Sequence, residues 1–365
     1  MHISSLATSD GGPPNAVVNI ASGLAKRGHD VTIVSRDESD ATVHSPKHPN
    51  VRVVTLKVRT HTRFNFSIRY LMAAWRASRD ATFVSTHGFY QFTCVTAWII
   101  ARARRIPLVV QPHGVFESYQ EQSSSAAKTL FMKVVGRRIL NDSQRLMLAS
   151  ESEAAGALEY VEPAKIVVAG LGVDPADHAA APQVRQGVVF LSRVAPKKRL
   201  DLLVEAMILV NEGRDVPVSL TICGDGGERF VAEMKSMTED LPWVEWRGQV
   251  AGSGKSAALL GASLYALPSD NENFGQAIVE AMAHGTPVIC TRACGASAHV
   301  ERANAGWIIA EPSERKLADT IVDALSDSER LTEAGRNAVE YSQRYLTWAN
   351  VARVWERECC SNEFS

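Results

Sequence analysis

The sequence lacks the features that mark several large classes of protein. Its longest apolar run, near Phe92–Ala101, is about half the length that a membrane-spanning helix needs. The amino terminus has no basic stretch followed by an apolar one, so no secretory signal is expected. The six cysteines form no CxxC pair and no zinc-type cluster with histidine. We therefore expect a protein of a reducing compartment that is cytoplasmic, or at most peripheral to the inner face of the membrane.

Motifs that would hold a metal or a dinucleotide are incomplete. No DxD carboxylate pair, of the kind that holds a divalent metal against a diphosphate, is present. AGSGKS at 251–256 resembles a P-loop, but Gln249 stands where its first glycine is required. Gly224-Asp225-Gly226 resembles the start of a dinucleotide-binding pattern, but Arg229 occupies the final glycine place. These mismatches argue against a nucleoside triphosphatase and against an NAD-dependent dehydrogenase.

What the sequence does contain is enough chain for two domains with different charge. It has 365 residues, at roughly 150 residues for each domain. Residues 1–171 contain 20 Lys and Arg against 13 Asp and Glu, a net charge of +7, whereas residues 172–365 contain 19 against 27, a net charge of −8. Two separate domains explain this division, and the basic half would suit an anionic partner. Chance variation in charge between domains explains it as well.

Short apolar strands alternate with amphipathic helices in both halves. The first half begins with a strand at Ile3–Leu6, a glycine and proline loop at Asp10–Pro14 and a helix over about Asn15–Arg27. Further strands are predicted at Val31–Ser35, Val51–Leu56, Thr82–Thr86, Leu108–Gln111, Arg145–Ala149 and Lys165–Ala169. Such alternation is typical of parallel βαβ units whose sheet is covered on both faces.

The same alternation restarts after an Ala- and Pro-rich linker at 172–186. The second half is predicted to contain strands near Val188–Leu191, Val218–Cys223, Val244–Trp246, Leu264–Leu267, Val288–Cys290 and Gly306–Ile309, and helices at Arg199–Glu212 and Gly275–His284. Consecutive helices fill the last 50 residues. The fold class is therefore α/β, with two Rossmann-like doubly wound parallel-sheet domains. Ligands of such sheets bind at the carboxyl ends of strands, so we expect the site in a cleft between the domains.

Two glutamates flank the start of the helix predicted after Leu267. Glu272 precedes this helix, in a polar loop, and Glu280 lies about one turn inside it. A helix amino terminus suits a phosphate, and Gly275 lets a ligand approach the backbone. Because helical side chains lean toward the amino terminus, Glu280 can reach a ribose diol while Glu272 meets a sugar beyond the phosphates. A capping acid and a solvated glutamate would explain two isolated carboxylates, but not the whole string PSDNENFGQAIVEAMAHGTPVI at 268–289.

Basic and histidine side chains follow other strands. Arg193 and Lys198 lie in the loop after Val188–Leu191, where they can neutralise a departing diphosphate, although a basic turn that caps a helix would look the same. Gly11-Gly12 can bring backbone near a diphosphate. His87 and His113 each close a strand before a glycine, where they can bind sugar hydroxyls or simply serve the structure.

These motifs together resemble the family 4 retaining glycosyltransferases, which share the GT-B fold. The resemblance rests on Leu191 onward, CGDG at 223–226, WRGQV at 246–250 and ENFGQAIVEAMAHGTPVI at 272–289. The stretch GGPPNAVVNIASGLAKRGHDVTIVS at 11–35 and QPHGVF at 111–116 fit the same family. The resemblance spans nearly the whole chain, and its carboxyl-terminal motifs stand in order at the family's spacing.

The resemblance implies roles for individual residues. Glu272 and Glu280 match the family's EX7E pair, with the first on the donor sugar and the second on the ribose, and Arg193 and Lys198 match its phosphate-binding pair. Other donor contacts that it implies are Gly12 near the diphosphate, Val250 at the nucleobase, His113 at the sugar, and the backbone of Asn273, Phe274, Gly275, Gln276 and Ala277. It implies an acceptor-binding domain at 1–171 joined by a helix at about 346–365, and a donor-binding domain at 172–345. The chain departs from the family at Arg199, where glycine is common, at Pro14 in the glycine loop, and at Asn273 in place of the glycine of EGFG.

The function predicted is transfer of a sugar, with retention of configuration, from a nucleotide diphosphate-sugar to an acceptor hydroxyl. Glu272, His113, Arg193 and Lys198 form the predicted catalytic set, and no cofactor or metal is expected. The family often serves polysaccharide, lipopolysaccharide or glycolipid synthesis, so the expected acceptor is a glycan or a lipid-linked glycan, with no nucleic-acid partner. Two alternatives stay open: another nucleotide-sugar enzyme of this fold, such as a 2-epimerase, and a non-catalytic nucleotide-sugar-binding module.

A basic and aromatic segment at residues 57–79 suggests a membrane contact. It mixes six Lys and Arg side chains with aromatic ones, namely Lys57, Arg59, Arg63, Arg69, Arg76 and Arg79 with Phe64, Phe66, Tyr70 and Trp75. Such a segment can lie on an anionic membrane surface. The competing interpretation is that the aromatic side chains pack into the domain core while the arginines are solvated.

Overall fold

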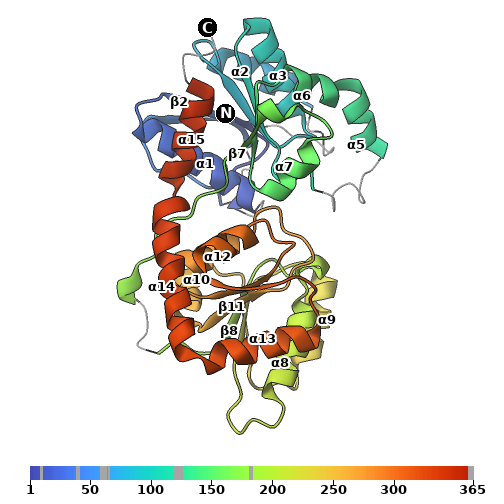
Figure 1. Cartoon of the computed structure of the whole chain (residues 1–365). Helices are drawn as coiled ribbons and strands as arrows, with labels where there is room; N and C mark the ends of the chain where they lie inside the picture. Colours follow the sequence, from blue (N-terminus) through green and yellow to red (C-terminus); the bar gives the residue numbers. More distant parts are fainter. Residues whose placement is uncertain are drawn as a thin grey trace. The chain divides into compact units, whose positions relative to one another are not determined.

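The computed structural model describes residues 1–8, 11–37, 42–57, 64, 66–117, 126–180 and 184–360. The chain forms two compact units (Figure 1). Unit 1 comprises Met1–Gly172 and Trp348–Ser365, and unit 2 comprises Val173–Thr347. Each unit is an α/β body with its own sheet and its own buried core, which confirms the predicted fold class.

Unit 1 is built on a parallel sheet whose described strands run in the order β3-β2-β1-β4-β5-β6-β7. The strands are β1 (His2–Ile3), β2 (Val31–Asp37), β3 (Val51–Lys57), β4 (Val84–His87), β5 (Leu108–Gln111), β6 (Arg145–Leu148) and β7 (Ile166–Val168). Helices between them include α1 (Gly12–Lys26), α2 (Ile68–Ala77), α3 (Phe92–Arg104), α5 (Ala126–Phe131), α6 (Arg137–Asp142) and α7 (Glu151–Ala157). The order reverses between β1 and β4, so the loops after these strands diverge and leave room for a ligand.

Unit 2 repeats this plan with the described order β10-β9-β8-β11-β12-β13. Its strands are β8 (Val188–Leu191), β9 (Leu220–Cys223), β10 (Val244–Gly248), β11 (Leu264–Leu267), β12 (Val288–Thr291) and β13 (Gly306–Ile309). The main helices are α8 (Leu200–Asn211), α9 (Glu228–Thr238), α10 (Gly252–Gly261), α11 (Gln276–Ala283), α12 (Ser297–Ala303), α13 (Glu314–Ser326) and α14 (Ser328–Tyr345). The central strands β8, β11 and β12 are buried along their whole length, as the apolar runs predict.

The beginning of the chain differs from the sequence prediction. The first strand is only His2–Ile3, where Ile3–Leu6 was predicted, and helix α1 begins at Gly12, where Asn15 was predicted. Pro13 and Pro14 therefore lie in the first helical turn. Proline is tolerated there because the first N–H groups of a helix have no intrahelical acceptor and the proline φ is helical. Pro14 belongs to the helix and not to the loop; Asp10, predicted in that loop, lies outside the described residues.

The last helix, α15 (Trp348–Cys360), packs in unit 1 beside α1, which confirms the predicted return of the chain (Figure 1). The two helices approach closely because Gly23 of α1 has no side chain: a Cβ there would lie 2.6 Å from Cβ of Ala352. Trp355 is fully buried, and its indole stacks on the ring of His87 at 5.5 Å between centroids. Glu356 accepts from Arg27 Nε at 2.6 Å. Helix α15 is therefore an integral part of unit 1.

The structure divides the aromatic side chains of the 57–79 segment between core and surface. Tyr70 of α2 is buried, and its hydroxyl donates to the Val34 carbonyl at 3.0 Å. Phe66 is 61% exposed and Trp75 is 41% exposed. Residues 58–63, which include Arg59 and Arg63, lie outside the described part of the chain. Within the described residues, no helix combines the length and apolar character needed to cross a membrane.

Candidate active site

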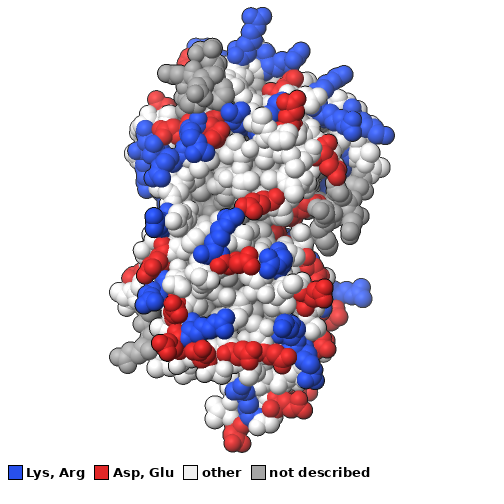
Figure 2. Space-filling view, in the orientation of Figure 1, with Lys and Arg blue, Asp and Glu red and all other residues white. Residues whose placement is uncertain are grey.

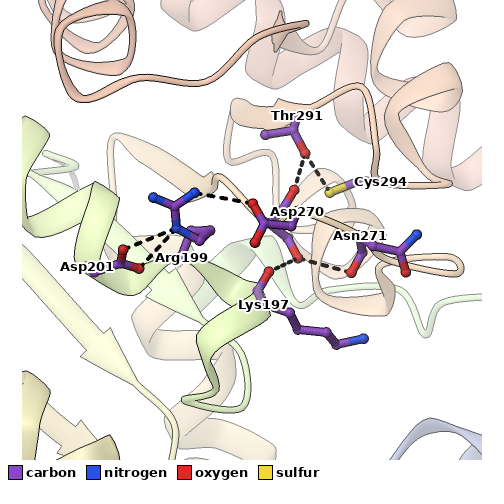
Figure 3. A network of polar contacts seen from close by, with 8 residues as sticks. Lys197, Arg199, Asp201, Asp270, Asn271, Thr291 and Cys294 are labelled. Atoms are coloured by element: carbon purple, nitrogen blue, oxygen red, sulfur yellow. Dashed lines mark hydrogen bonds and ion pairs between the residues drawn. The ribbon is translucent and has the colours of Figure 1, made fainter. Parts of the chain in front are cut away.

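Three loops meet at the carboxyl edge of the unit 2 sheet, after β8, β11 and β12. The Lys197 carbonyl accepts from Ser269 Oγ at 2.8 Å and from Asp270 N at 2.9 Å, which joins the first loop to the second. Thr291 Oγ1 donates to the Ser269 carbonyl at 2.5 Å, which joins the second to the end of β12. Figure 3 shows Lys197, Asp270 and Thr291 close together where the three loops meet. Because β8, β11 and β12 are neighbours in the sheet, these contacts make the three loops one connected surface.

Lys198 and Glu272 form a nearly buried ion pair on this surface. Nζ of Lys198 contacts Oε1 of Glu272, and the two side chains are only 11% and 12% exposed. The backbone of Glu272 is held on both sides, because its N–H donates to the Ala293 carbonyl at 3.2 Å and its own carbonyl accepts from Gly295 N at 2.9 Å. Two residues predicted to act on the same donor are thus brought together, with a fixed carboxylate and a fixed ammonium side by side.

Arg199, one residue further on, occupies a strained backbone conformation. Its φ is 52° and its ψ is 45°, in the left-handed region that glycine adopts more easily. The departure noted at this position therefore has a structural consequence. Its guanidinium bridges Asp201, at 3.1 Å, and Asp270, at 3.3 Å, between the loops (Figure 3). These contacts offset part of the strain of about 1–3 kcal/mol that such a conformation costs.

Arg193, the other predicted phosphate ligand, lies in the same loop. Its side chain is exposed, and within the described residues the structure gives its guanidinium no ion pair or hydrogen bond. It therefore differs from Lys198, whose side chain is held in place by its contact with Glu272.

Helix α11 begins on this surface directly after Gly275. Gly275 has φ 85°, a left-handed conformation that a side chain disfavours, and as the N-cap residue it has no side chain with which to cap the helix. Phe274 is buried, with its carbonyl bonded to Ala296 N at 2.6 Å and its ring against His299 at 5.8 Å. Three further predicted donor-binding residues, Asn273, Gln276 and Ala277, are half-buried around the helix start. The uncapped start offers backbone N–H groups and the positive end of the helix dipole to an anion.

Glu280 points from α11 toward α10. Its Oε1 lies 2.7 Å from Nζ of Lys255, in the first turns of α10. The two helices are joined a second time, by His284 Nε2 and Ser256 Oγ at 3.1 Å. Val250, predicted at the nucleobase, is half-buried and follows β10 two residues before α10 begins. Sequence reasoning missed Lys255; the available signal was its place in AGSGKS, which fails only the glycine frame of a P-loop.

His113 lies after β5 in unit 1 and is constrained on several sides. Its φ of 59° is left-handed, and its Nε2 lies 3.4 Å from Nδ1 of His87. Glu153, which sequence reasoning also missed, is fully buried and accepts from Gly114 N at 2.5 Å and from Ala149 N at 3.1 Å, so it holds the loop next to His113. Burial lowers the pKa of His113 to about 4, so its imidazole is neutral at pH 7. A neutral imidazole can bind hydroxyls but supplies no fixed positive charge.

Gly12, also in unit 1, is the first residue of α1 and is exposed. Apart from its chain neighbours and the nearby backbone of α1, a Cβ built on it would meet no atom within 4 Å. No other part of unit 1 therefore excludes a side chain here. The predicted residues divide between the units: Gly12 and His113 belong to unit 1, whereas Arg193, Lys198, Val250, Glu272–Ala277 and Glu280 belong to unit 2.

Both units match families of known proteins. Residues 173–341 match the family described as "Glycosyl transferases group 1", and residues 11–172 match the "Glycosyl transferase 4-like domain". The chain belongs to the family 4 glycosyltransferases. Its fold is GT-B, as the resemblance implied.

Two relatives of this glycosyltransferase are named for inositol-containing substrates. It is 25% identical over 391 residues to the D-inositol 3-phosphate glycosyltransferase of Corynebacterium glutamicum, and the alignment covers 96% of this chain and 93% of that protein. It is 30% identical over 230 residues to the phosphatidyl-myo-inositol mannosyltransferase of Mycobacterium leprae, covering 61% of this chain and 59% of that one. The crystal structure of HepE from Anabaena, in complex with UDP and glucose, has a TM-score of 0.75 and 17% identity over 99% of this chain and 98% of that one.

Proposed function

We propose that this glycosyltransferase moves a sugar from a nucleoside diphosphate-sugar to an acceptor hydroxyl with retention of configuration and without a metal ion. The observation that carries the proposal is the arrangement around α11, where an uncapped helix start lies between two carboxylate–ammonium pairs, Lys198–Glu272 and Lys255–Glu280. A nucleotide-sugar has the matching order of groups: a sugar rich in hydroxyls, a diphosphate and a ribose diol.

In the proposed reaction the bond from the anomeric carbon to the diphosphate oxygen breaks, and a bond from that carbon to the acceptor oxygen forms on the same face. The acceptor proton passes to the departing phosphate oxygen. Lys198 would stabilise the negative charge that develops on the diphosphate, together with Arg193 and the start of α11. These cationic groups take the part that a divalent metal takes in enzymes with a DxD pair.

Glu272 orients the donor sugar in this proposal and forms no covalent adduct. Its carboxylate contacts Lys198, and its backbone is tied to Ala293 and Gly295, so its position is fixed before a ligand arrives. A carboxylate held beside an ammonium is a good acceptor for sugar hydroxyls but a weakened nucleophile. His113, neutral because of its lowered pKa, would add a hydrogen bond to the sugar and not a charge.

Donor binding and metal dependence test this proposal directly. Calorimetry with UDP-, GDP- and ADP-sugars identifies the donor, and Glu280→Ala should then raise its Kd about tenfold to a hundredfold, since a hydrogen bond to a charged group contributes roughly 1.5–3 kcal/mol. Activity should survive EDTA, and NMR of the product should show the donor's anomeric configuration. Unchanged affinity in the Glu280 variant, metal-dependent activity or an inverted product would each contradict one part of the proposal.

A lipid-linked acceptor is the second part of the proposal, supported by a surface of unit 1. Apolar side chains of α2 and of the segment before it are exposed, namely Phe66, Ile68, Met72 and Trp75. The exposed Arg69 and Arg76 lie among them, and the net charge of residues 1–171 is +7. Lys and Arg side chains are frequent over unit 1 in the view of Figure 2. Such a combination suits an anionic membrane surface, and the two named relatives act on inositol compounds.

Sedimentation with anionic and neutral vesicles tests the membrane surface. Binding to anionic vesicles should weaken with salt and should fall in Arg69→Glu/Arg76→Glu. The matched control, Arg229→Glu/Arg315→Glu, makes the same change of charge on unit 2 and should leave binding unchanged. If the wild type stays in the supernatant equally with both kinds of vesicle at low salt, the proposal that the surface around Phe66 binds an anionic membrane is wrong.

A further inference from the structure

The pair formed by Lys255 and Glu280 is the part of the site that the motif itself does not explain. Nζ of Lys255 lies 2.7 Å from Oε1 of Glu280, and their side chains are 31% and 13% exposed. A second contact, between His284 Nε2 and Ser256 Oγ at 3.1 Å, also joins α10 to the end of α11. The ammonium is therefore placed on a carboxylate that the proposed function assigns to the ribose, and it is accessible from solvent.

We propose that Lys255 is a second ribose-binding residue, which together with Glu280 selects ribonucleotide over deoxyribonucleotide donors; this inference rests on the proposed function. A carboxylate only accepts hydrogen bonds and an ammonium only donates them, whereas a hydroxyl does both. One hydroxyl of the ribose diol can therefore donate to Glu280 and accept from Lys255 at once. A deoxyribose that lacks this hydroxyl cannot form a hydrogen bond to either charged group at that position.

The position of Lys255 along the chain supports this role. It lies in the first turns of α10, five residues after Val250, the position assigned to the nucleobase. Helix α10 starts without a side-chain cap, as α11 does. Lys255 thus lies close along the chain to the position that the family resemblance assigns to the base, and its side chain contacts the carboxylate that the proposed function assigns to the ribose.

The test measures binding of UDP and GDP and of their 2′-deoxy and 3′-deoxy forms by calorimetry, using the full chain. For the nucleotide that the wild type binds, loss of the bridged hydroxyl should raise Kd about tenfold. Lys255→Met should raise Kd of the ribonucleotide by a similar factor and that of the matching deoxy form less than about twofold. Lys255→Arg should recover part of the preference. The control Arg336→Met removes an exposed ion pair with Glu333 on α14, outside the three loops of the site, and should change neither affinity.

Results that overturn this inference are distinguishable from a result that overturns the proposed function. An equal loss of affinity for ribonucleotide and deoxyribonucleotide in Lys255→Met, or a lower Tm with unchanged affinities, would show that the pair only joins α10 to α11. Failure of the wild type to bind any nucleoside diphosphate would instead contradict the proposed function itself. That result is obtained with the unaltered protein and therefore does not concern Lys255.

Discussion

Replacing Lys198 by methionine separates the structural from the catalytic role of the Lys198–Glu272 pair. Methionine keeps most of the side-chain volume but removes the ammonium, which leaves the Glu272 carboxylate 12% exposed and without its cation. An uncompensated buried charge costs about 3–5 kcal/mol when fully desolvated. Because both side chains retain some solvent contact, we expect a loss at or below the lower limit of that range, about 2–3 kcal/mol in the unfolding free energy of unit 2.

The same substitution should affect the reaction by a separate mechanism. Removing one group that stabilises developing charge typically lowers kcat about a hundredfold to a thousandfold. The double variant Lys198→Met/Glu272→Gln distinguishes the two effects, because neutralising Glu272 removes the unpaired charge. It should recover most of the lost stability while its kcat stays as low as that of the single variant, or lower.

Urea denaturation followed by fluorescence gives the stability, and release of nucleoside diphosphate at saturating donor gives kcat. Because the chain has two compact units, each transition is fitted separately. A kcat of Lys198→Met within tenfold of the wild type would refute the assignment of Lys198 to the leaving group. A double variant no more stable than the single one would show that the unpaired carboxylate is not the cause of the destabilisation.

Three further predictions concern single positions. Arg199→Ala should be less stable than Arg199→Gly by about 1 kcal/mol in urea denaturation, because alanine retains the left-handed strain at φ 52° and glycine does not; equal stability would contradict that reasoning. Gly12→Ala should lower the Tm only slightly, since a Cβ at Gly12 meets no atom within 4 Å outside its chain neighbours, but should lower kcat/KM if backbone at Gly12 approaches the donor as the family resemblance implies; unchanged kinetics would remove that role. Burial lowers the pKa of His113 to about 4, against about 6.5 when unfolded, so its contribution to the unfolding free energy of unit 1 falls as the pH drops from about 6.5 to 4, by up to about 3 kcal/mol. His113→Asn should make this part of the profile less steep without flattening it, because burial also lowers the pKa values of His2, His87 and the amino terminus; an unchanged slope would contradict the assignment.

Local patterns were sufficient to predict most of the elements. The strands β5, β8, β11 and β13 have the bounds expected from their apolar runs. Prediction failed at the start of the chain, where Pro13 and Pro14 look like a loop in sequence. Proline interrupts a helix only in its interior, and whether it falls in the first turn depends on where the helix begins.

The function class was readable from sequence because a helix start and its flanking residues form a local unit. Glu272, Gly275 and Glu280 lie within nine residues, so the place of Gly275 and Glu280 relative to α11 follows from helix geometry, whereas Glu272 is set by its contacts with the loop after β12. The same holds for Arg193 and Lys198 after β8. Residues whose relation is local can be assigned from the chain order once the strand before them is recognised.

The sequence by itself determined the alternation of strands and helices, the two-domain plan and the motif around α11, because these depend on contacts between near neighbours. Only the tertiary structure decided which charges meet: Lys198 with Glu272, and Lys255 with Glu280. Each pair joins loops or helices that follow different strands, and their separation depends on the order of β8, β11 and β12 in the sheet and on how α10 packs against α11. Strand order and helix packing are set by the total apolar surface that a whole unit buries. A short stretch of sequence does not show which distant residues contribute to that burial.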